Sequence, residues 1–252
     1  NISNRIQIRY SHELPEDPNI NNGESRGSFR LPRARMKFDG WFSNKELTYE
    51  LQVDWTDSAA IIRDLNVNYD LTHGKKLLQL KGGQFKVPFG RQELTSSGNQ
   101  QFVDRSIFSA EFQKGRDIGI QTWGQTPRGT IEWRAGLFNG AGRNKTANDN
   151  DKFQWNARVL WQPFGDVKYS ESDFESTGSR PLLAVAANYE ANNLQGATSG
   201  VDIDREVFGG DLSFKWHGVS LMAEYFHKVS EPEGAVPAAN AADFDTDRWH
   251  AQ

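Results

Sequence analysis

The feature that most limits how this chain can fold is an alternation of apolar and polar residues, repeated in about eleven separate segments. In residues 47–55, every second residue is leucine, tyrosine, valine or tryptophan, and the residues between them are polar. Successive side chains of a β-strand point to opposite faces, so each segment is predicted to be a strand with one apolar and one polar face. Within residues 29–38, Pro32 shifts the phase of the alternation, which predicts a β-bulge.

The composition indicates that the apolar residues are too few to fill a large central core. Hydrophobic residues make up 37% of the 252 residues, and the mean hydropathy is -0.71. The longest uncharged apolar stretch, 182–187, is far shorter than the ~18 residues that a membrane-spanning helix needs. The chain has no cysteine, which excludes disulfides and thiolate chemistry, and its net charge of -4 argues against a nucleic-acid partner.

The connections between the predicted strands alternate between short and long along the chain. Turns are expected at 44–45, 73–75, 125–128 and 217–218, and long loops at 11–27, 89–115, 140–151, 192–205 and 230–246. A soluble β-sandwich also alternates, but this asymmetry of connections is typical of transmembrane up-and-down barrels, so the sequence favours an antiparallel barrel in an outer membrane. Two connections break the pattern, because 56–59 is short and 164–180 is long.

Aromatic residues gather near the ends of the predicted strands. In a membrane barrel such residues form two girdles at the lipid–water interfaces, whereas in a β-sandwich they would belong to the core. The candidates for the girdles are Tyr10, Trp41, Trp55, Tyr69, Trp123, Trp161, Tyr189, Trp216 and Tyr225.

Several stretches resemble one known family, the phosphate-selective porin O and P family. They are RARMKFDG (33–40), GQFKVPFGRQELTSS (83–97), QFVDRSIFSAEF (101–112), GRDIGIQTWG (115–124) and GLFNG (136–140). The resemblance implies a single porin domain over residues 1–252 that lies in the bacterial outer membrane and forms a passive channel for small hydrophilic solutes. It also implies a homotrimer of barrels with about sixteen strands, about eleven or twelve of them present here. In that family a third loop folds inward, and residues 89–115 follow the fifth predicted strand, where that loop is expected.

The polar face of each predicted strand would line the water-filled pore, and its charges would decide which ions enter. Its basic candidates are Arg5, Arg9, Arg33, Arg35, Lys37, Lys81, Arg134, Arg158 and Lys215, and its acidic ones are Glu50, Asp54, Asp64, Asp70, Asp117, Glu132, Asp211 and Glu224. The first two predicted strands are basic and the next two acidic, which predicts a transverse field across the pore. A basic track from the first two strands would favour anions, while the alternative is a solvated face without selectivity.

The inward loop supplies the candidates for the constriction of the pore. They are Arg91, Glu93, Ser96, Ser97, Asp104 and Arg105. Phosphate-selective members of the family imply a lysine close to serines in this loop, but here Ser97 is followed by Gly98. The sequence therefore leaves the preference for phosphate open.

Three weaker motifs are interpreted as chance matches. Residues 23–27 (GESRG) match a hydrolase nucleophile elbow but lie in a predicted loop, not between a strand and a helix. The five histidines lack metal-ligand spacing, and the aspartates at 243, 245 and 247 lack the glycine of a calcium loop. We therefore expect no catalytic residue, no metal and no cofactor.

Two other functions remain open from the sequence. One is a soluble β-rich domain that binds or cleaves carbohydrate, and the other is a barrel that serves as a structural sleeve or receptor for a partner protein. Residues 247–252 look like the opening of a twelfth strand. Because open strand edges are costly in lipid, the complete barrel is expected to need about four more strands, from this chain or from another.

Overall fold

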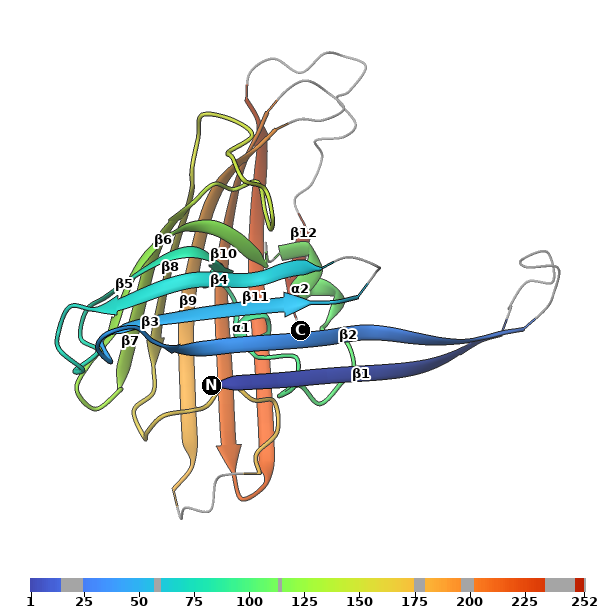
Figure 1. Ribbon diagram of the computed structural model, residues 1–252, viewed down its shortest axis with the longest axis horizontal. Coiled ribbons are helices and arrows are strands. Elements are labelled where there is room, and N and C mark those ends of the chain that lie inside the picture. Colours follow the sequence, from blue (N-terminus) through green and yellow to red (C-terminus); the bar gives the residue numbers. More distant parts are fainter. Residues whose placement is uncertain are drawn as a thin grey trace.

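The computed structural model describes residues 1–14, 25–56, 60–112, 115–174, 180–195, 202–233 and 248–251 (Figure 1). The predicted short connection at 56–59, the predicted long loops at 11–27, 192–205 and 230–246, and the GESRG motif lie partly outside these residues. The aspartates at 243, 245 and 247 lie wholly outside them. The described residues form twelve strands and two short helices. In chain order these are β1 (Ile2–Glu13), β2 (Arg26–Trp41), β3 (Leu47–Asp54), β4 (Ile61–Asp70), β5 (Gln79–Lys86), α1 (Arg91–Leu94), α2 (Ile107–Phe112), β6 (Arg116–Gln125), β7 (Ile131–Phe138), β8 (Gln154–Trp161), β9 (Leu182–Leu194), β10 (Ile203–Trp216), β11 (Val219–Pro232) and β12 (Arg248–Ala251).

The strands form one antiparallel sheet in which each strand pairs with the next along the chain, from β1 at one edge to β12 at the other. Figure 1 shows that the sheet is strongly twisted, because β1 to β4 cross the direction of β8 to β11 at a large angle. The meander that the alternation predicted is therefore confirmed. Neither helix in the described part of the chain is long and apolar enough to cross a membrane.

Two bulges interrupt the register of the sheet. Between the pairs Gln7–Arg33 and Arg9–Arg30, β2 contributes two residues where β1 contributes one, so the predicted bulge at Pro32 is confirmed. In β4, Gln52 pairs with Asp64 and Val53 with Ile62, which leaves Arg63 as an extra residue. A bulge re-aims the side chain of its extra residue, and this one affects the candidate site.

Burial on the two faces of the sheet is the reverse of that in a soluble protein. In β8, Trp155 and Val159 expose 62% and 52% of their surface on the outer face, whereas Asn156 and Arg158 expose 3% and 1% on the inner face. Large apolar side chains are exposed in the same way along β1, β4, β6, β10 and β11. An outer apolar face and an inner polar face fit a sheet that is surrounded by lipid and encloses water.

Most of the predicted girdle residues lie on this outer face. Trp41, Trp55 and Trp216, for instance, are largely exposed. The prediction for Trp123 is wrong: its indole nitrogen donates to Asn68 Oδ1 at 2.7 Å on the inner face. Trp123 has the phase of the buried Gln121, so the alternation of β6 itself points it inward.

The inner face is partly covered by two chain segments. The first is the inward loop, residues 87–112, which carries α1 and α2 between β5 and β6. The second, residues 162–174, connects β8 to β9 and is called here the second inward segment. Small apolar clusters hold both against the sheet, one around Phe89, Phe112 and Phe226, and one around Leu160 and Val167.

Candidate functional site

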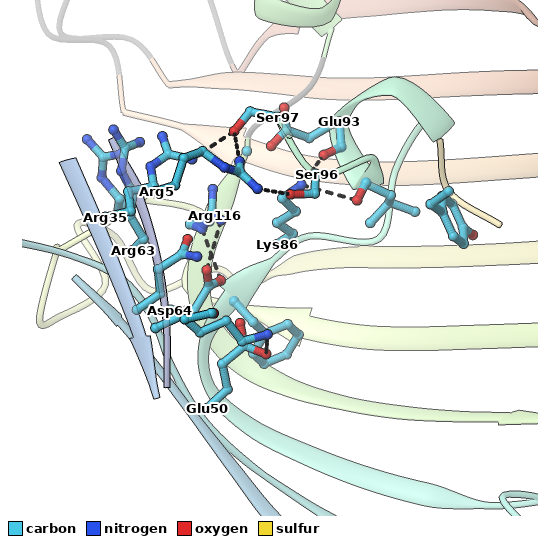
Figure 2. Close-up of a pocket in the computed structure, with 18 of the residues that line it drawn as sticks. Arg5, Arg35, Glu50, Arg63, Asp64, Lys86, Glu93, Ser96, Ser97 and Arg116 are labelled. Atoms are coloured by element: carbon cyan, nitrogen blue, oxygen red, sulfur yellow. Dashed lines mark hydrogen bonds and ion pairs between the residues drawn. The ribbon is translucent and has the colours of Figure 1, made fainter. Parts of the chain in front are cut away.

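A polar cavity of about 720 Å3 lies on the inner side of the sheet, between β1 to β7 and the inward loop (Figure 2). Among the described residues, ten basic and three acidic side chains line it. The basic ones are Arg5, Arg35, Lys37, Arg63, Lys81, Lys86, Arg105, Arg116, Arg134 and Arg143, and the acidic ones are Glu50, Asp64 and Glu93.

Two arginines meet at the serines of the inward loop. Arg5 and Arg35 are register partners on β1 and β2, so their like charges lie directly opposite each other. Both donate to Ser97 Oγ, from Arg5 Nη1 at 2.8 Å and from Arg35 Nη1 at 3.1 Å, and Arg5 Nη2 lies 3.4 Å from Ser96 Oγ. Like charges directly opposite each other destabilise a strand pair, and a hydroxyl offers no charge to offset them.

Each acidic side chain of the cavity has a basic partner. Glu50 lies 3.3 Å from Lys37 Nζ, and Glu93 lies 3.2 Å from Arg105 Nε. Asp64 accepts two hydrogen bonds from Arg116, at 3.0 and 2.8 Å, in the bidentate geometry that suits this pair. Asp54, which does not line the cavity, binds both Arg35 and Arg63. Three acidic side chains of the predicted transverse field, Glu50, Asp54 and Asp64, are therefore compensated by basic side chains of β2, β4 and β6.

Four cations of the cavity remain without a carboxylate partner among the described residues: Arg5, Lys81, Lys86 and Arg143. Arg5 binds the serine hydroxyls, and Lys81 Nζ lies 4.6 Å from the ring centre of Phe85. Lys86 Nζ donates to three backbone carbonyls at the end of α1: those of Glu93, of Leu94 at 3.2 Å and of Thr95 at 3.1 Å. Because these partners are neutral, the cavity keeps a net positive charge.

Arg105 joins two parts of the inward loop by hydrogen bonds beside the cavity. Its guanidinium donates to the carbonyl oxygens of Gln92 at 3.2 Å and Thr95 at 3.0 Å. Burial lowers the pKa of Arg105, and the neighbouring Glu93 opposes that shift. A guanidinium stays charged under physiological conditions despite such shifts, so Arg105 adds a fixed positive charge to the cavity.

The structure brings five of the nine predicted basic pore-lining residues together in the cavity: Arg5, Arg35, Lys37, Lys81 and Arg134. Three of the other four lie elsewhere on the inner side, and Lys215 binds residues 168–172. Arg9 and Arg33 bind Asp104 of the inward loop at 2.9 and 3.9 Å, and Arg158 forms a buried ion pair with Asp211 of β10. These three cations lie next to carboxylates outside the cavity, and Arg9 and Arg33 share the single carboxylate of Asp104.

The predicted constriction residues divide in the same way. Glu93, Ser96, Ser97 and Arg105 line the cavity. Asp104 reaches Arg9 on β1, and Arg91 turns away from the cavity, where it is fully buried and donates to the carbonyl oxygens of Val167 and Lys168 at 2.8 Å each.

Sequence reasoning missed four of the basic lining residues: Arg63, Lys86, Arg116 and Arg143. Arg63 is next to the inward-facing Asp64 and should point outward, but the bulge in β4 turns it to Asp54 on the inner side. Lys86 has the opposite phase to the inward Lys81 of β5, so alternation would have pointed it outward. Arg116 opens β6 directly after the loop, and Arg143 lies in the connection from β7 to β8, where alternation gives no signal.

The chain is similar to one known protein family and to solved structures of an outer membrane protein. The family model of the phosphate-selective porin O and P matches residues 2–226. No curated protein matches the chain. Two solved structures of OmpT, an outer membrane protein of Vibrio cholerae, align over 92% of the chain with TM-scores of 0.40. One is a loop L8 deletion mutant (10% identity, 83% of its chain covered), and the other is the in-vitro folded trimer form (12% identity, 78% covered).

The family match covers the strands from β1 to the middle of β11, including the inward loop and all of the cavity's lining. Porins of this kind are channels without catalytic chemistry, so the expectation that the chain is not an enzyme is confirmed. The chain belongs to the phosphate-selective porin O and P family and is a porin of the bacterial outer membrane.

Proposed function

We infer that this porin is a passive channel for small hydrophilic solutes that prefers anions, with phosphate or another small anion as its solute. The observation that carries the proposal is the charge of the cavity beside the inward loop, where ten basic side chains face three acidic ones that are themselves paired. A volume of about 720 Å3 is many times the ~30 Å3 that one water takes in the liquid, so a small hydrated anion fits.

The physical basis is attraction without tight binding. Guanidinium and ammonium groups donate charge-assisted hydrogen bonds to phosphate and carboxylate oxygens. In a wet site, two unit charges 4 Å apart interact by only about 1–4 kcal/mol, so an anion that enters can also leave, as conduction requires.

Arg5 and Arg35 are the pair at which we expect the anion to pass. Their only shared partner among the described residues is the hydroxyl of Ser97. An anion beside this hydroxyl would offer acceptors to both guanidinium groups and would offset the repulsion between them.

Phosphate remains a candidate because the structure supplies a lysine beside the serines. The loop sequence itself has none next to Ser97, but Lys86 reaches from β5 to the carbonyl oxygen of Thr95, the residue before Ser96. Lys86, Ser96 and Ser97 all line the cavity. They would together offer two hydroxyls and the positive charge of Lys86 to a phosphate, while the three N–H groups of Lys86 stay bound to the carbonyl oxygens of residues 93–95.

The proposed shape of the complete channel is the closed barrel that its family implies. We infer that the sheet closes into an up-and-down barrel of about sixteen strands, because unpaired edges at β1 and β12 would be costly in lipid. A homotrimer is the proposed assembly. A purified protein that migrates as a trimer in unheated SDS gels and as a monomer after boiling would support it, and a monomer in both lanes would contradict it.

The experiment that tests the function is the reversal potential of the purified, reconstituted protein across a planar bilayer in a KCl gradient. If the channel prefers anions, the reversal potential has the sign expected when chloride permeates more readily than potassium. The opposite sign would refute the anion preference, and no conductance at all would refute the channel.

A further inference from the structure

The second inward segment, residues 162–174, lies where the alternation of short and long connections predicts a tight turn. It begins at the end of β8 and follows the inner face of the sheet. Val167 is buried in a cluster with Leu160 of β8 and with Ala184 and Ala186 of β9. An apolar contact on the inner face means that the segment is packed inside the sheet and does not hang from its rim.

The first link between this segment and the inward loop is Arg91 of α1. Its side chain is fully buried, and Arg91 Nη2 donates to the carbonyl oxygens of Val167 and Lys168 at 2.8 Å each. The guanidinium also lies over the ring of Tyr169, 4.6 Å from its centre. Because each of these contacts requires its own orientation, the buried guanidinium holds the second inward segment in one position relative to α1.

The second link is Glu171, which binds the inward loop at two places. Its carboxylate accepts from the backbone nitrogen of Gln101 at 2.6 Å and from Gln92 Nε2 at 3.4 Å. Its backbone nitrogen donates to the carbonyl oxygen of Asn99 at 2.8 Å. Glu171 is nearly buried, so these hydrogen bonds meet little competition from water.

The segment is in turn anchored to β10 and β11. Lys215 Nζ donates to Ser170 Oγ at 2.5 Å and to the carbonyl oxygen of Ser172 at 3.1 Å. Ser220 Oγ donates to the carbonyl oxygen of Glu171 at 2.5 Å, and the backbone nitrogen of Gly218 donates to Asp173 Oδ2 at 3.0 Å. The sheet thus holds the segment, and the segment holds the loop.

The inward loop also contacts this half of the sheet directly. The backbone nitrogen of Gln92 donates to Glu224 of β11 at 2.9 Å, and Phe112 stacks on Phe226 with ring centres 5.4 Å apart. The basic cavity lies on the other side of the loop, beside β1 to β7, and Tyr169 of the second inward segment reaches its lining. The position of the loop therefore sets how wide the space beside Arg5 and Arg35 is.

We propose that residues 162–174 are a positioning element that fixes the inward loop and so sets the width of the passage, with Arg91 and Glu171 as the positioning residues. Neither needs to touch the solute. The inference rests on the proposed channel but not on its preference for anions.

The test uses the absence of cysteine from the chain. In the full-length double variant Asn99→Cys, Glu171→Cys, the two thiols are the only ones present, at positions joined by a backbone hydrogen bond. Oxidation to a disulfide replaces the lost contacts with a covalent link. Single-channel recording in a planar bilayer then compares the oxidised and reduced states of the same folded protein.

The oxidised channel should conduct as the unmodified protein does. After reduction, at least two hydrogen bonds of the Glu171 side chain are missing, so the time spent at a higher conductance level should rise roughly tenfold. Larger neutral polymers should enter, and the reversal potential should keep its sign. Equal conductance, noise and polymer exclusion in both states would overturn the proposal.

Single variants give a second readout. Glu171→Ala should spend more time at the higher conductance level. Glu171→Gln should behave as the unmodified protein, because its amide oxygen can still accept a hydrogen bond from the backbone nitrogen of Gln101. Glu13→Ala, which removes an exposed carboxylate at the end of β1, is the matched control and should change nothing. If Glu171→Gln widened the channel as much as Glu171→Ala, the positioning role of the hydrogen bonds would be refuted. A cation-selective reversal potential would refute only the anion preference.

Discussion

Arg5 and Arg35 lie directly opposite each other on neighbouring strands and share one acceptor, the hydroxyl oxygen of Ser97. Arg35 has a carboxylate partner in Asp54, while Arg5 has none among the described residues. A strand pair that places two arginines opposite each other is less stable, and β1 and β2 place them so beside the inward loop. This is the arrangement on which we base the proposal that an anion is favoured in the passage.

The ion pair of Arg158 and Asp211 predicts a large effect on stability. Arg158 exposes 1% and Asp211 4% of its surface, and Arg158 donates to both carboxylate oxygens. Asp211→Asn should lower the free energy of unfolding by about 3–5 kcal/mol, because it leaves a buried, unpaired charge. The temperature at which the band of the unheated protein in SDS gels converts to the band of the boiled protein measures this change.

The double variant Arg158→Met, Asp211→Leu is the control for that prediction. Because it removes both charges, it should regain most of the lost thermal stability. If Asp211→Asn were as stable as the unmodified protein, the pair would not be buried as described.

If the outer face of β8 lies in lipid, placing an arginine on it should reduce the stability of the folded protein by an amount that depends on its depth in the lipid. Val159→Arg, within the strand, should destabilise the folded protein in liposomes by about 2–4 kcal/mol, whereas a charge near the interface costs about 0–1 kcal/mol. Phe153→Arg, just before β8, is the matched interfacial variant, since both side chains are about half exposed. Urea unfolding in liposomes measures both. Equal values for the two variants would argue against a lipid-facing outer surface.

Gly83 and Gly82 form a matched pair of positions on β5. Gly83 has φ +123°, and a Cβ there would lie 2.2 Å from the carbonyl oxygen of Leu65, whereas a Cβ on Gly82 would meet only Ile120, at 3.9 Å. Gly83→Ala should therefore cost about 1–3 kcal/mol through backbone strain and displacement of β4, while Gly82→Ala should be close to neutral. The same urea titration separates them, and a neutral Gly83→Ala would contradict the observed backbone.

Most of the fold could be predicted because a strand's alternation depends only on local sequence. The bulge at Pro32 and the long loop after β5 are examples, since proline and connection length leave clear traces. The second inward segment could be recognised only as an exception to the loop pattern. Its position depends on contacts such as Arg91 with Val167, which join residues far apart in the chain.

The site could be predicted less completely than the fold. Arg5 and Arg35 follow the phase of their strands, so sequence placed them on the inner side. Arg63 could not be found, because a bulge without proline or glycine reverses its direction. Arg158 has the right phase but belongs to a buried ion pair, and phase says nothing about which carboxylate a cation will meet.

The measurement that tests the account most directly is the reversal potential of the variant Arg5→Gln, Arg35→Gln in a KCl gradient, beside the unmodified protein. A matched control is Lys75→Gln, Lys45→Gln, which removes two charges from exposed turns. We expect the unmodified protein and the control to prefer chloride and the arginine variant to lose most of that preference while still conducting. An unchanged reversal potential in the arginine variant would contradict the claim that this cavity selects anions.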